Sequence, residues 1–486
     1  MEKGQAQERP VLIQKFGGTS VATAETRAQV TGHVRQALQQ GYAPVVVVSA
    51  MGRAGAPYAT DTLLSLVQDI ARDTSPRSLD LLLSCGETIS AVIMAETLRV
   101  AGIPAVPFTG AQAGIITDNQ FGSARILRIQ PERIWQALSQ GIVPVVAGFQ
   151  GVTESGEITT LGRGGSDTTA AALGVALRAV EVQIFTDVNG VMTADPRIEP
   201  DARTLRTISY REVMEMAQLG AKVIHPRAVE IAMEGRVPLR VLATGSRAPG
   251  TLIVDAREMA KRSGEPVTPV EIRSDRVVRA VTQMGEMARV VLTDVGGTTD
   301  PQTLEIFTSL AAGGISLDMI QVEPGRIAFA IDASRVGLAR SILLGLGHRP
   351  AIESGFVKVS AVGGGMQGVP GVMARILRAL ADANVTVYHT SDSHVNISCL
   401  VRSGDMAMAV RALHREFLLD AEDDPPSPMA QTVRPTAALT RDDREKRNGY
   451  SQVPVRIEAA QAREQAGRVG TSSTREGSDE HATGVW

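Results

Sequence analysis

The stretch that decides the fold is Val11-Leu12-Ile13-Gln14-Lys15-Phe16-Gly17-Gly18-Thr19-Ser20, in which an apolar strand runs directly into a glycine turn beside a lysine. Adjacent glycines leave their N–H groups bare and reach backbone angles closed to other residues, so this turn can cradle an anion where the next helix begins. Lys15 precedes the glycines, whereas the common phosphate loop GxxxxGK[ST] places its lysine after them. Alone, the motif is equally compatible with an ordinary turn and a solvated lysine.

Working outward, the chain from residue 11 to about 255 alternates short aliphatic runs with helical stretches. The apolar runs are Pro44–Val48, Pro144–Ala147 and Val182–Thr186, and helix formers fill segments such as Ala170–Leu177 and Tyr210–Leu219. Unbroken apolar runs indicate strands buried on both faces. The pattern predicts an α/β domain with a mainly parallel central sheet over residues 11–255.

A polar linker at 256–276 separates this domain from a region of different character. There the order strand, helix, strand, strand, helix occurs twice, with a repeat of roughly 70 residues. The expected strands are 289–293, 315–320, 326–331, 356–361, 385–389 and 394–401, and the expected helices are 301–312, 334–345, 370–382 and 405–417. We therefore predict two small α+β domains, 277–350 and 351–419. Residues 420–486 lack apolar periodicity and are predicted to be mostly disordered.

Composition limits the possible functions. The 49 Lys and Arg residues against 52 Asp and Glu give a formal net charge of -3, which argues against nucleic acid as a partner. The N-terminus has no apolar signal core, and we find no run of about 18 apolar residues that would span a membrane. Cys85 and Cys399 each lie in an apolar stretch, which favours buried reduced thiols and a cytoplasmic protein, with no metal site expected.

A second glycine cluster, Thr159-Thr160-Leu161-Gly162-Arg163-Gly164-Gly165-Ser166-Asp167, opens the alanine-rich helix at 170–177. Ser166 and Asp167 are natural N-cap residues, which is the plain structural interpretation. An arginine inside a glycine turn at a helix N-terminus is nevertheless well suited to a planar carboxylate. We favour an anion site here.

A third element, Thr186-Asp187-Val188-Asn189-Gly190-Val191-Met192, continues to Arg197 after a predicted strand. Asn189-Gly190 and Asp195-Pro196 mark turns, so a long surface loop is one interpretation. Loops at the carboxyl ends of parallel strands are, however, where open α/β sheets bind ligands. Asp187, Arg197 and Lys222 are therefore candidates to meet a nucleotide.

These motifs, together with Gly220-Ala221-Lys222-Val223-Ile224-His225-Pro226-Arg227-Ala228, resemble in order those of the aspartokinases, which are amino-acid kinases. The resemblance spans about 11–255, and the duplicated region resembles the paired βαββαβ ACT domains of that family. It implies transfer of the γ-phosphoryl group of ATP to the side-chain carboxylate of L-aspartate, giving 4-phospho-L-aspartate, with Mg²⁺ on the phosphates.

The resemblance also assigns residues. Lys15, Ser49 and Asp167 would be catalytic, with Lys15 neutralising the transferring phosphoryl group and Asp167 organising Lys15 or the Arg163 loop. Glu87 would bind the ammonium group of the substrate. The substrate carboxylate would be held by four residues, namely Arg163, Gly164, Gly165 and Ser166. The nucleotide side would comprise Lys15, Phe16, Gly17, Gly18, Thr186, Asp187, Met192, Thr193, Ala194, Asp195, Pro196, Arg197, Lys222 and Val223. His225 is expected to be a packing residue rather than a catalyst.

The chain departs from the family pattern at two places. Met192 stands where most relatives have tyrosine, which replaces an aromatic contact with a flexible thioether. The segment Met51–Thr62 is longer than the family's SAMGxTTD, so the substrate-side threonine is not assigned to Thr60. This longer loop resembles the branch of the family that diaminopimelate inhibits.

The paired ACT domains imply feedback control by lysine, threonine or diaminopimelate, and assembly of a homo-oligomer; a plain dimerisation platform is the alternative. Two other functions remain open: a kinase of the same fold acting on glutamate, acetylglutamate or a nucleoside monophosphate, and a catalytically silent amino-acid sensor. Against the sensor, Lys15, Arg163, Asp187 and Lys222 are all present.

Overall fold

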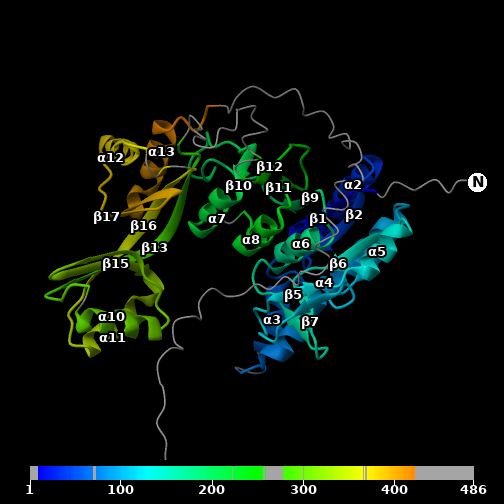
Figure 1. Ribbon diagram of the computed structural model, residues 1–486, viewed down its shortest axis with the longest axis horizontal. Helices are drawn as coiled ribbons and strands as arrows, with labels where there is room; N and C mark the ends of the chain where they lie inside the picture. The colour runs from blue at the N-terminus through cyan, green and yellow to red at the C-terminus, as the bar shows by residue number, and fades with distance from the viewer. Residues whose placement is uncertain are drawn as a thin grey trace, which may run out of the picture. The chain divides into compact units, whose positions relative to one another are not determined.

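Strand β1 (Val11–Phe16) lies inside an eight-stranded sheet in this computed structural model (Figure 1). The order is β10 (Thr207–Ser209), β12 (Thr251–Val254), β11 (Leu239–Ala243), β9 (Glu181–Thr186), β1, β2 (Ala43–Val48), β6 (Val143–Ala147) and β3 (Ala105–Phe108). All neighbouring strands are parallel except β11 and β12. The predicted mainly parallel sheet is therefore confirmed.

The structure describes residues 9–68, 70, 73–221, 223–255, 258, 277–298, 300–364, 366 and 369–421. The predicted linker at 256–276 and the predicted disordered tail at 420–486 lie almost wholly outside these residues. Lys222 also lies outside them.

Helices cover both faces of the large sheet. Helices α2 (Ala24–Gln39) and α4 (Pro76–Val100) pack on one face, and α5 (Glu132–Ser139), α6 (Gly165–Ala176), α7 (Tyr210–Gln218) and α8 (Pro226–Gly235) pack on the other. The run Val45–Val48 is completely buried between the two layers. Each such valine contributes about 1.5–3 kcal/mol by burial, which explains the unbroken apolar run in the sequence.

A smaller four-stranded sheet leads into the second glycine cluster. Its order is β5 (Ile126–Ile129), β4 (Ile115–Thr117), β7 (Gln150–Thr153) and β8 (Ile158–Thr160). Because β8 ends at Thr160, this sheet delivers the Gly162–Gly165 turn to the start of α6. Two short helices, α1 (Gly18–Val21) and α3 (Thr60–Gln68), follow β1 and the loop after β2.

The C-terminal region forms one six-stranded antiparallel sheet (Figure 1). Its order is β14 (Asp318–Glu323), β15 (Arg326–Asp332), β13 (Ala280–Thr293), β16 (Ala351–Val362), β18 (Asn396–Arg402) and β17 (His389–Asp392). The helices are α10 (Pro301–Ala312), α11 (Val336–Gly345), α12 (Val372–Asp382) and α13 (Met406–Glu416), with short 3-10 turns η1 (Ala333–Arg335) and η2 (Ser403–Asp405). All four predicted helices and six predicted strands are found, although β14 begins three residues and β17 four residues later than predicted.

Strands β13 and β16 are longer than predicted and serve both α+β units. The first half of β13, Ala280–Met284, pairs with the second half of β16. The second half of β13, Met287–Thr293, pairs with β15 on one side and with the first half of β16 on the other. A bulge separates the halves, with Glu286 at a positive φ of 58°. Each α+β unit therefore contains one half of β13 and one half of β16. The predicted division of the two domains at 350/351 stays a prediction.

Two further expectations need correction. Among the described helices, α4 is long and apolar enough to pass the length and composition test for a membrane span, contrary to the expectation that no segment would. A core helix passes the same test, and part of α4 is buried against β3, β6 and β8.

The second correction concerns the cysteines. Cys399 is buried, which raises the pKa of its thiol to about 12, but Cys85 is exposed. Both thiols are free, as predicted.

Candidate active site

The pairing of Lys15 with Asp167 forms the centre of the site. Side chains alternate across a strand, so Lys15 points to the same face as Val11 and Ile13, the face covered by α6. Lys15 Nζ lies 2.6 Å from Asp167 Oδ1 in the first turn of α6, and the two side chains are 11% and 13% exposed. The ion pair therefore holds the ammonium group at the carboxyl end of β1.

The second glycine cluster forms a tight turn ahead of α6. Gly164 is the N-cap with φ of 70°, a left-handed conformation, and a Cβ there would lie 2.2 Å from Cγ of His225. Ser166 and Asp167 lie inside the first turn instead of capping it, which corrects the plain structural interpretation. Their side chains are therefore available to the site. His225 packs on the turn, and burial lowers its pKa, in line with a packing role.

Glu87 faces this turn from helix α4. Ser75 caps α4 and Pro76 occupies its first turn, and the helix brings Asp80 and Glu87 to one buried face. Glu87 is 3% exposed, and burial raises its pKa to about 8, although the Ala50 amide and Lys15 act in the opposite direction. Its Oε2 atom is buried without a hydrogen-bond partner. A buried carboxyl group with an unpaired oxygen is suited to receive a cation.

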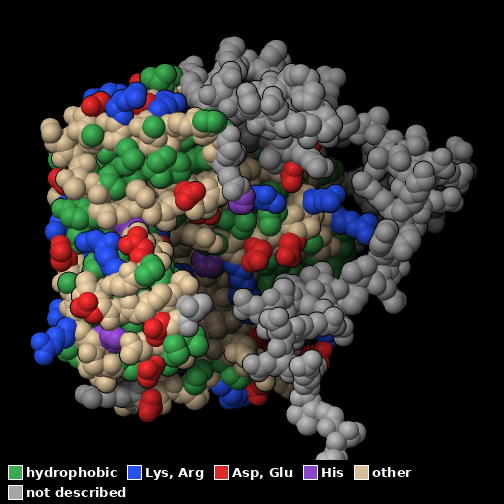
Figure 2. Space-filling model, turned by 60° about the vertical axis from the view of Figure 1, so that its left-hand side comes forward, with side chains coloured by type: hydrophobic (Ala, Val, Ile, Leu, Met, Phe, Trp, Pro, Cys, Tyr) green, Lys and Arg blue, Asp and Glu red, His purple; other side chains and the backbone are tan. Residues whose placement is uncertain are grey.

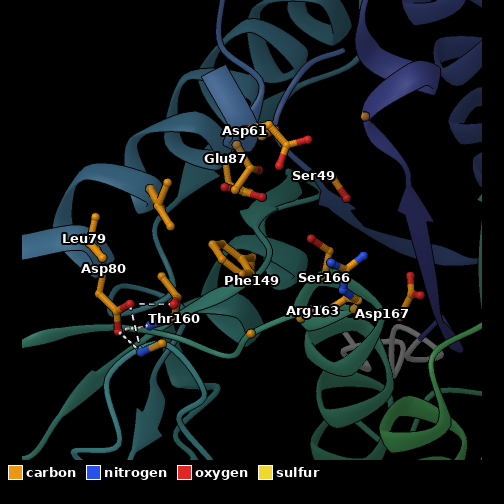
Figure 3. Close-up of a pocket in the computed structure, with 18 of the residues that line it drawn as sticks. Ser49, Asp61, Leu79, Asp80, Glu87, Phe149, Thr160, Arg163, Ser166 and Asp167 are labelled. Carbon is orange, nitrogen blue, oxygen red and sulfur yellow. Dashed lines mark hydrogen bonds between the residues drawn. The ribbon is translucent and has the colours of Figure 1, made fainter. Parts of the chain in front are cut away.

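These residues line one cavity of about 510 Å³. Figure 3 shows Glu87 and Asp61 on one wall, Arg163, Ser166 and Asp167 on the opposite wall, and Phe149 between them. Of the predicted residues, the cavity collects Lys15, Gly18, Ser49, Glu87, Arg163, Gly164, Gly165, Ser166 and Asp167. The two motifs at the ends of β1 and β8 thus meet in space.

Sequence reasoning missed several lining residues, including Phe149, Asp61 and Asp80, and Thr60, to which no role was assigned, also lines the cavity. Asp80 is 1% exposed and accepts hydrogen bonds from the Gly122 amide, the Thr160 amide and the Thr160 hydroxyl, at 2.7–3.0 Å (Figure 3). These bonds attach α4 to β8 and so fix the distance between the Glu87 wall and the Arg163 turn. The available signal was an aspartate followed two helical turns later by a glutamate on one face of a predominantly apolar helix.

We expect Asp80→Asn to lower the free energy of unfolding by about 3 kcal/mol, because an amide NH₂ would face donors that a buried carboxylate now satisfies. Urea denaturation monitored by circular dichroism measures the loss. Asp118→Asn is the matched control, since Asp118 accepts two backbone amides of the same loop but in an exposed setting. Equal losses in the two variants would contradict this account.

The predicted nucleotide residues divide into several groups. Phe16 is completely buried and stacks on Phe185 with ring centroids 4.6 Å apart, so its side chain is a core residue. The Gly17 amide donates to the Phe185 carbonyl at 3.2 Å, so the predicted cradle begins at Gly18. Gly18 is required by space, because a Cβ would lie 2.5 Å from the Ala50 carbonyl oxygen. In helix α1 the Ser20 amide donates to the Gly17 carbonyl at 2.9 Å, so the Gly18 and Thr19 amides are the ones that the helix geometry leaves without an internal acceptor.

The carboxyl ends of β9, β1, β2 and β6 are neighbours along one edge of the sheet, which brings Asp187, Gly18, Ser49 and Phe149 into a row. Asp187 Oδ2 accepts a hydrogen bond at 2.5 Å from Arg53, a residue of the long loop after β2. Both side chains are more than half exposed, so this pair adds little stability. Thr186 donates to the other Asp187 oxygen.

The predicted loop from Met192 to Arg197 lies outside the cavity. Thr193 and Ala194 are buried, whereas Arg197 is exposed and bonds Asp195. That arginine lowers the pKa of Asp195. The side chains of Thr193 and Ala194 therefore pack into the core, and their predicted contact with a nucleotide stays a prediction. Met192 forms an isolated bridge with Thr204, and Val223 is half-buried.

Comparison with known proteins supports this assignment of the fold. Residues 10–243 match the amino acid kinase family, and residues 359–417 match an ACT domain. The parallel sheet, the glycine turn before α6 and the paired α+β units, together with these matches, thus define a kinase of the amino acid kinase family with regulatory ACT domains.

Comparison with individual relatives identifies the family more specifically. The chain is 45% identical to aspartokinase 1 of Bacillus subtilis over 409 residues, covering 84% of this chain and 99% of the relative. It is 41% identical to the aspartokinase of Geobacillus stearothermophilus, covering 85% and 98%. Escherichia coli aspartokinase III, solved with aspartate and ADP, matches with a TM-score of 0.65 and 26% identity over 84% of this chain and 100% of that one. The chain belongs to the aspartokinase family, and it is a nucleotide-dependent kinase subject to ACT regulation.

Proposed function

We propose that this enzyme transfers the γ-phosphoryl group of ATP to the side-chain carboxylate of L-aspartate, giving 4-phospho-L-aspartate and ADP. The observation that carries the proposal is the charge layout of the cavity: a buried acid, Glu87, on one wall and Arg163 with Lys15 toward the other. A zwitterion with a second carboxylate complements this layout. The solved E. coli relative was crystallised with aspartate and ADP.

Substrate would be oriented by its three charged groups. Arg163 and the backbone of Gly164–Ser166 would hold the α-carboxylate, because an arginine fork and first-turn amides match its planar geometry. Glu87 would accept the ammonium group. The side-chain carboxylate would then reach toward Lys15, where Ser49 also lines the cavity.

The reaction needs charge compensation more than proton transfer. The attacking carboxylate is ionised near neutral pH, and as its oxygen bonds to the γ-phosphorus, the bond to the bridging oxygen breaks and ADP leaves with the electron pair. Two unit charges 4 Å apart repel by about 4 kcal/mol at an effective dielectric near 20. Lys15, held in place by Asp167, would offset this repulsion at the point of transfer.

The nucleotide phosphates would lie over Gly18 and the start of α1, next to Ser49 and Asp187. In the described part of the chain, no group of three or more His, Cys, Asp or Glu residues is arranged to hold a metal ion. The residues fit Mg²⁺ carried mainly by phosphate oxygens, with exposed Asp187 as the carboxylate on that side. When bound, Mg²⁺ would supply neutralisation of phosphate charge.

Hydroxylamine trapping tests the proposal, because an acyl phosphate reacts to a coloured hydroxamate and a phosphate ester does not. We expect hydroxamate with ATP and L-aspartate, and at least about 100-fold less with L-glutamate, whose extra methylene would displace the reacting carboxylate from Lys15. Trapping with glutamate and not with aspartate would overturn the assignment.

We also propose that the enzyme supplies the diaminopimelate, lysine, threonine and methionine route in the cytoplasm and that lysine, threonine or diaminopimelate is its effector. One E. coli relative was solved with lysine and aspartate. The paired α+β units would assemble a homo-oligomer, and the long loop after β2 favours the diaminopimelate-sensitive branch. Inhibition by each amino acid, alone and in pairs, distinguishes the effectors.

A further inference from the structure

The centre of the predicted nucleotide loop, Thr193 and Ala194, packs against the ACT region of the chain. Thr193 is 1% exposed, and Ala194 belongs to the hydrophobic core that contains Val281 of β13 and Val410 and Leu413 of α13. The Val281 amide also donates to the Thr193 carbonyl at 2.8 Å. The centre of this loop therefore packs with the last helix of the ACT region, although it follows β9 of the kinase sheet.

Three polar contacts connect this segment with α13 and the residues just after it. Thr193 Oγ1 lies 3.0 Å from His414 Nε2, and both residues are buried. Arg411 Nε donates to the Ile198 carbonyl at 2.9 Å, and Arg203 Nε donates to the Leu419 carbonyl at 3.0 Å. The contacts span the loop from Thr193 to Arg203, so they fix its position along the helix.

The Thr193–His414 contact is the most specific of the three. Thr193 Oγ1 already accepts the Arg203 amide at 2.9 Å, so its own proton is free to be donated to a neutral imidazole nitrogen. Burial lowers the pKa of His414, although Glu199, Asp201 and Asp420 oppose this shift. The neutral ring is therefore the form that fits, with Nε2 as acceptor.

We infer that His414 is a positioning residue for the nucleotide: through the Thr193 hydroxyl it holds the Met192–Arg197 loop, and α13 thereby sets nucleotide affinity. This inference rests on the nucleotide contact that the family resemblance predicts for Met192–Arg197 and on the proposed use of ATP. The exposed end of the loop, Pro196 and Arg197, is left to approach the nucleotide, while its buried centre is attached to the regulatory helix. A shift of α13 would move the loop without touching the Glu87 and Arg163 walls of the substrate cavity.

The test compares Thr193→Val and His414→Leu, which remove the hydrogen bond at nearly constant size, with Thr193→Ser and His414→Gln, which can keep it. Calorimetry measures the dissociation constant for ADP, and steady-state assays give the KM for ATP and for aspartate. We expect about fivefold weaker ADP binding and a similar rise in the KM for ATP in each removing variant. The KM for aspartate stays unchanged, the double variant is no worse than either single one, and the conservative variants recover most of the affinity.

Thr303→Val is the matched control. Thr303 is a buried threonine whose hydroxyl donates to the Gly296 carbonyl in the first α+β unit, away from the loop. Unchanged ADP affinity in Thr193→Val, an equal loss in Thr303→Val, or additive losses in the double variant would each overturn the inference. ADP binding is measured without aspartate. If the wild-type protein failed to phosphorylate aspartate, the proposed function would be refuted, but the effect of the variants on ADP affinity could still be measured and interpreted.

Discussion

Lys15→Met is expected to lower kcat about 10³-fold while the protein stays folded. The variant keeps most of the apolar stem but removes the charge where a carboxylate must meet a phosphoryl group. It also leaves Asp167, only 13% exposed, without its partner at 2.6 Å, which adds an unpaired negative charge to the same place. Rapid-quench measurement of hydroxamate formation gives the chemical step directly.

Asp167→Asn separates these two effects, because it removes the anchor and leaves the Lys15 charge. A loss of about tenfold is expected there, since a less ordered ammonium group still neutralises charge. Thermal unfolding and far-UV circular dichroism report whether each variant is folded. If Lys15→Met retained kcat within about fivefold of wild type, charge neutralisation by Lys15 would not be the source of catalysis.

Much of this site could be predicted because its signals are local in sequence. The direction of the Lys15 side chain follows from the two-residue period of β1. The turn at Gly164 is marked by glycine, because this position has a left-handed conformation and a close neighbour that leaves no space for a side chain. The carboxyl ends of parallel strands share one edge of a sheet, so separate motifs could be expected to meet. Lys15 and Ser49, from the neighbouring strands β1 and β2, fit that expectation, because both line the cavity. Arg163 reaches the same cavity from β8 of the separate four-stranded sheet, which this argument does not predict.

The parts that were missed depend on contacts between distant residues. Asp80 is recognisable only once the Gly122 loop and Thr160 are seen to donate to it. The burial of Thr193 depends on His414, more than 200 residues later. The shared halves of β13 and β16 likewise follow from pairing across the chain, because each apolar run fits a single strand and only the bulge near Glu286 divides its two roles.

If Glu87 binds the ammonium group as proposed, its raised pKa should make aspartate binding depend on pH near neutrality, where a carboxyl group of ordinary pKa would stay ionised. Burial raises the pKa of this carboxyl group to about 8 in the empty cavity, so the free enzyme at pH 7 carries it mainly protonated. The substrate ammonium group requires the ionised form. We therefore expect kcat/KM for aspartate to be constant above about pH 8 and to fall about tenfold per pH unit below it, because this ratio reports the pKa of the free enzyme.

Glu87→Gln should raise the KM for aspartate about 30-fold at pH 8.5, since a buried charge partner is lost, and should abolish the pH dependence near 8. Calorimetry in buffers of different ionisation enthalpy adds an independent measurement: wild-type enzyme releases close to one proton when aspartate binds at pH 7, and the variant releases none. Lys15 holds the pKa of Glu87 below the value that burial alone would give, so Lys15→Met should move the wild-type inflection upward. An inflection near 8 that survives in Glu87→Gln would assign the titration to another group, and Glu87 would then not be the ammonium ligand.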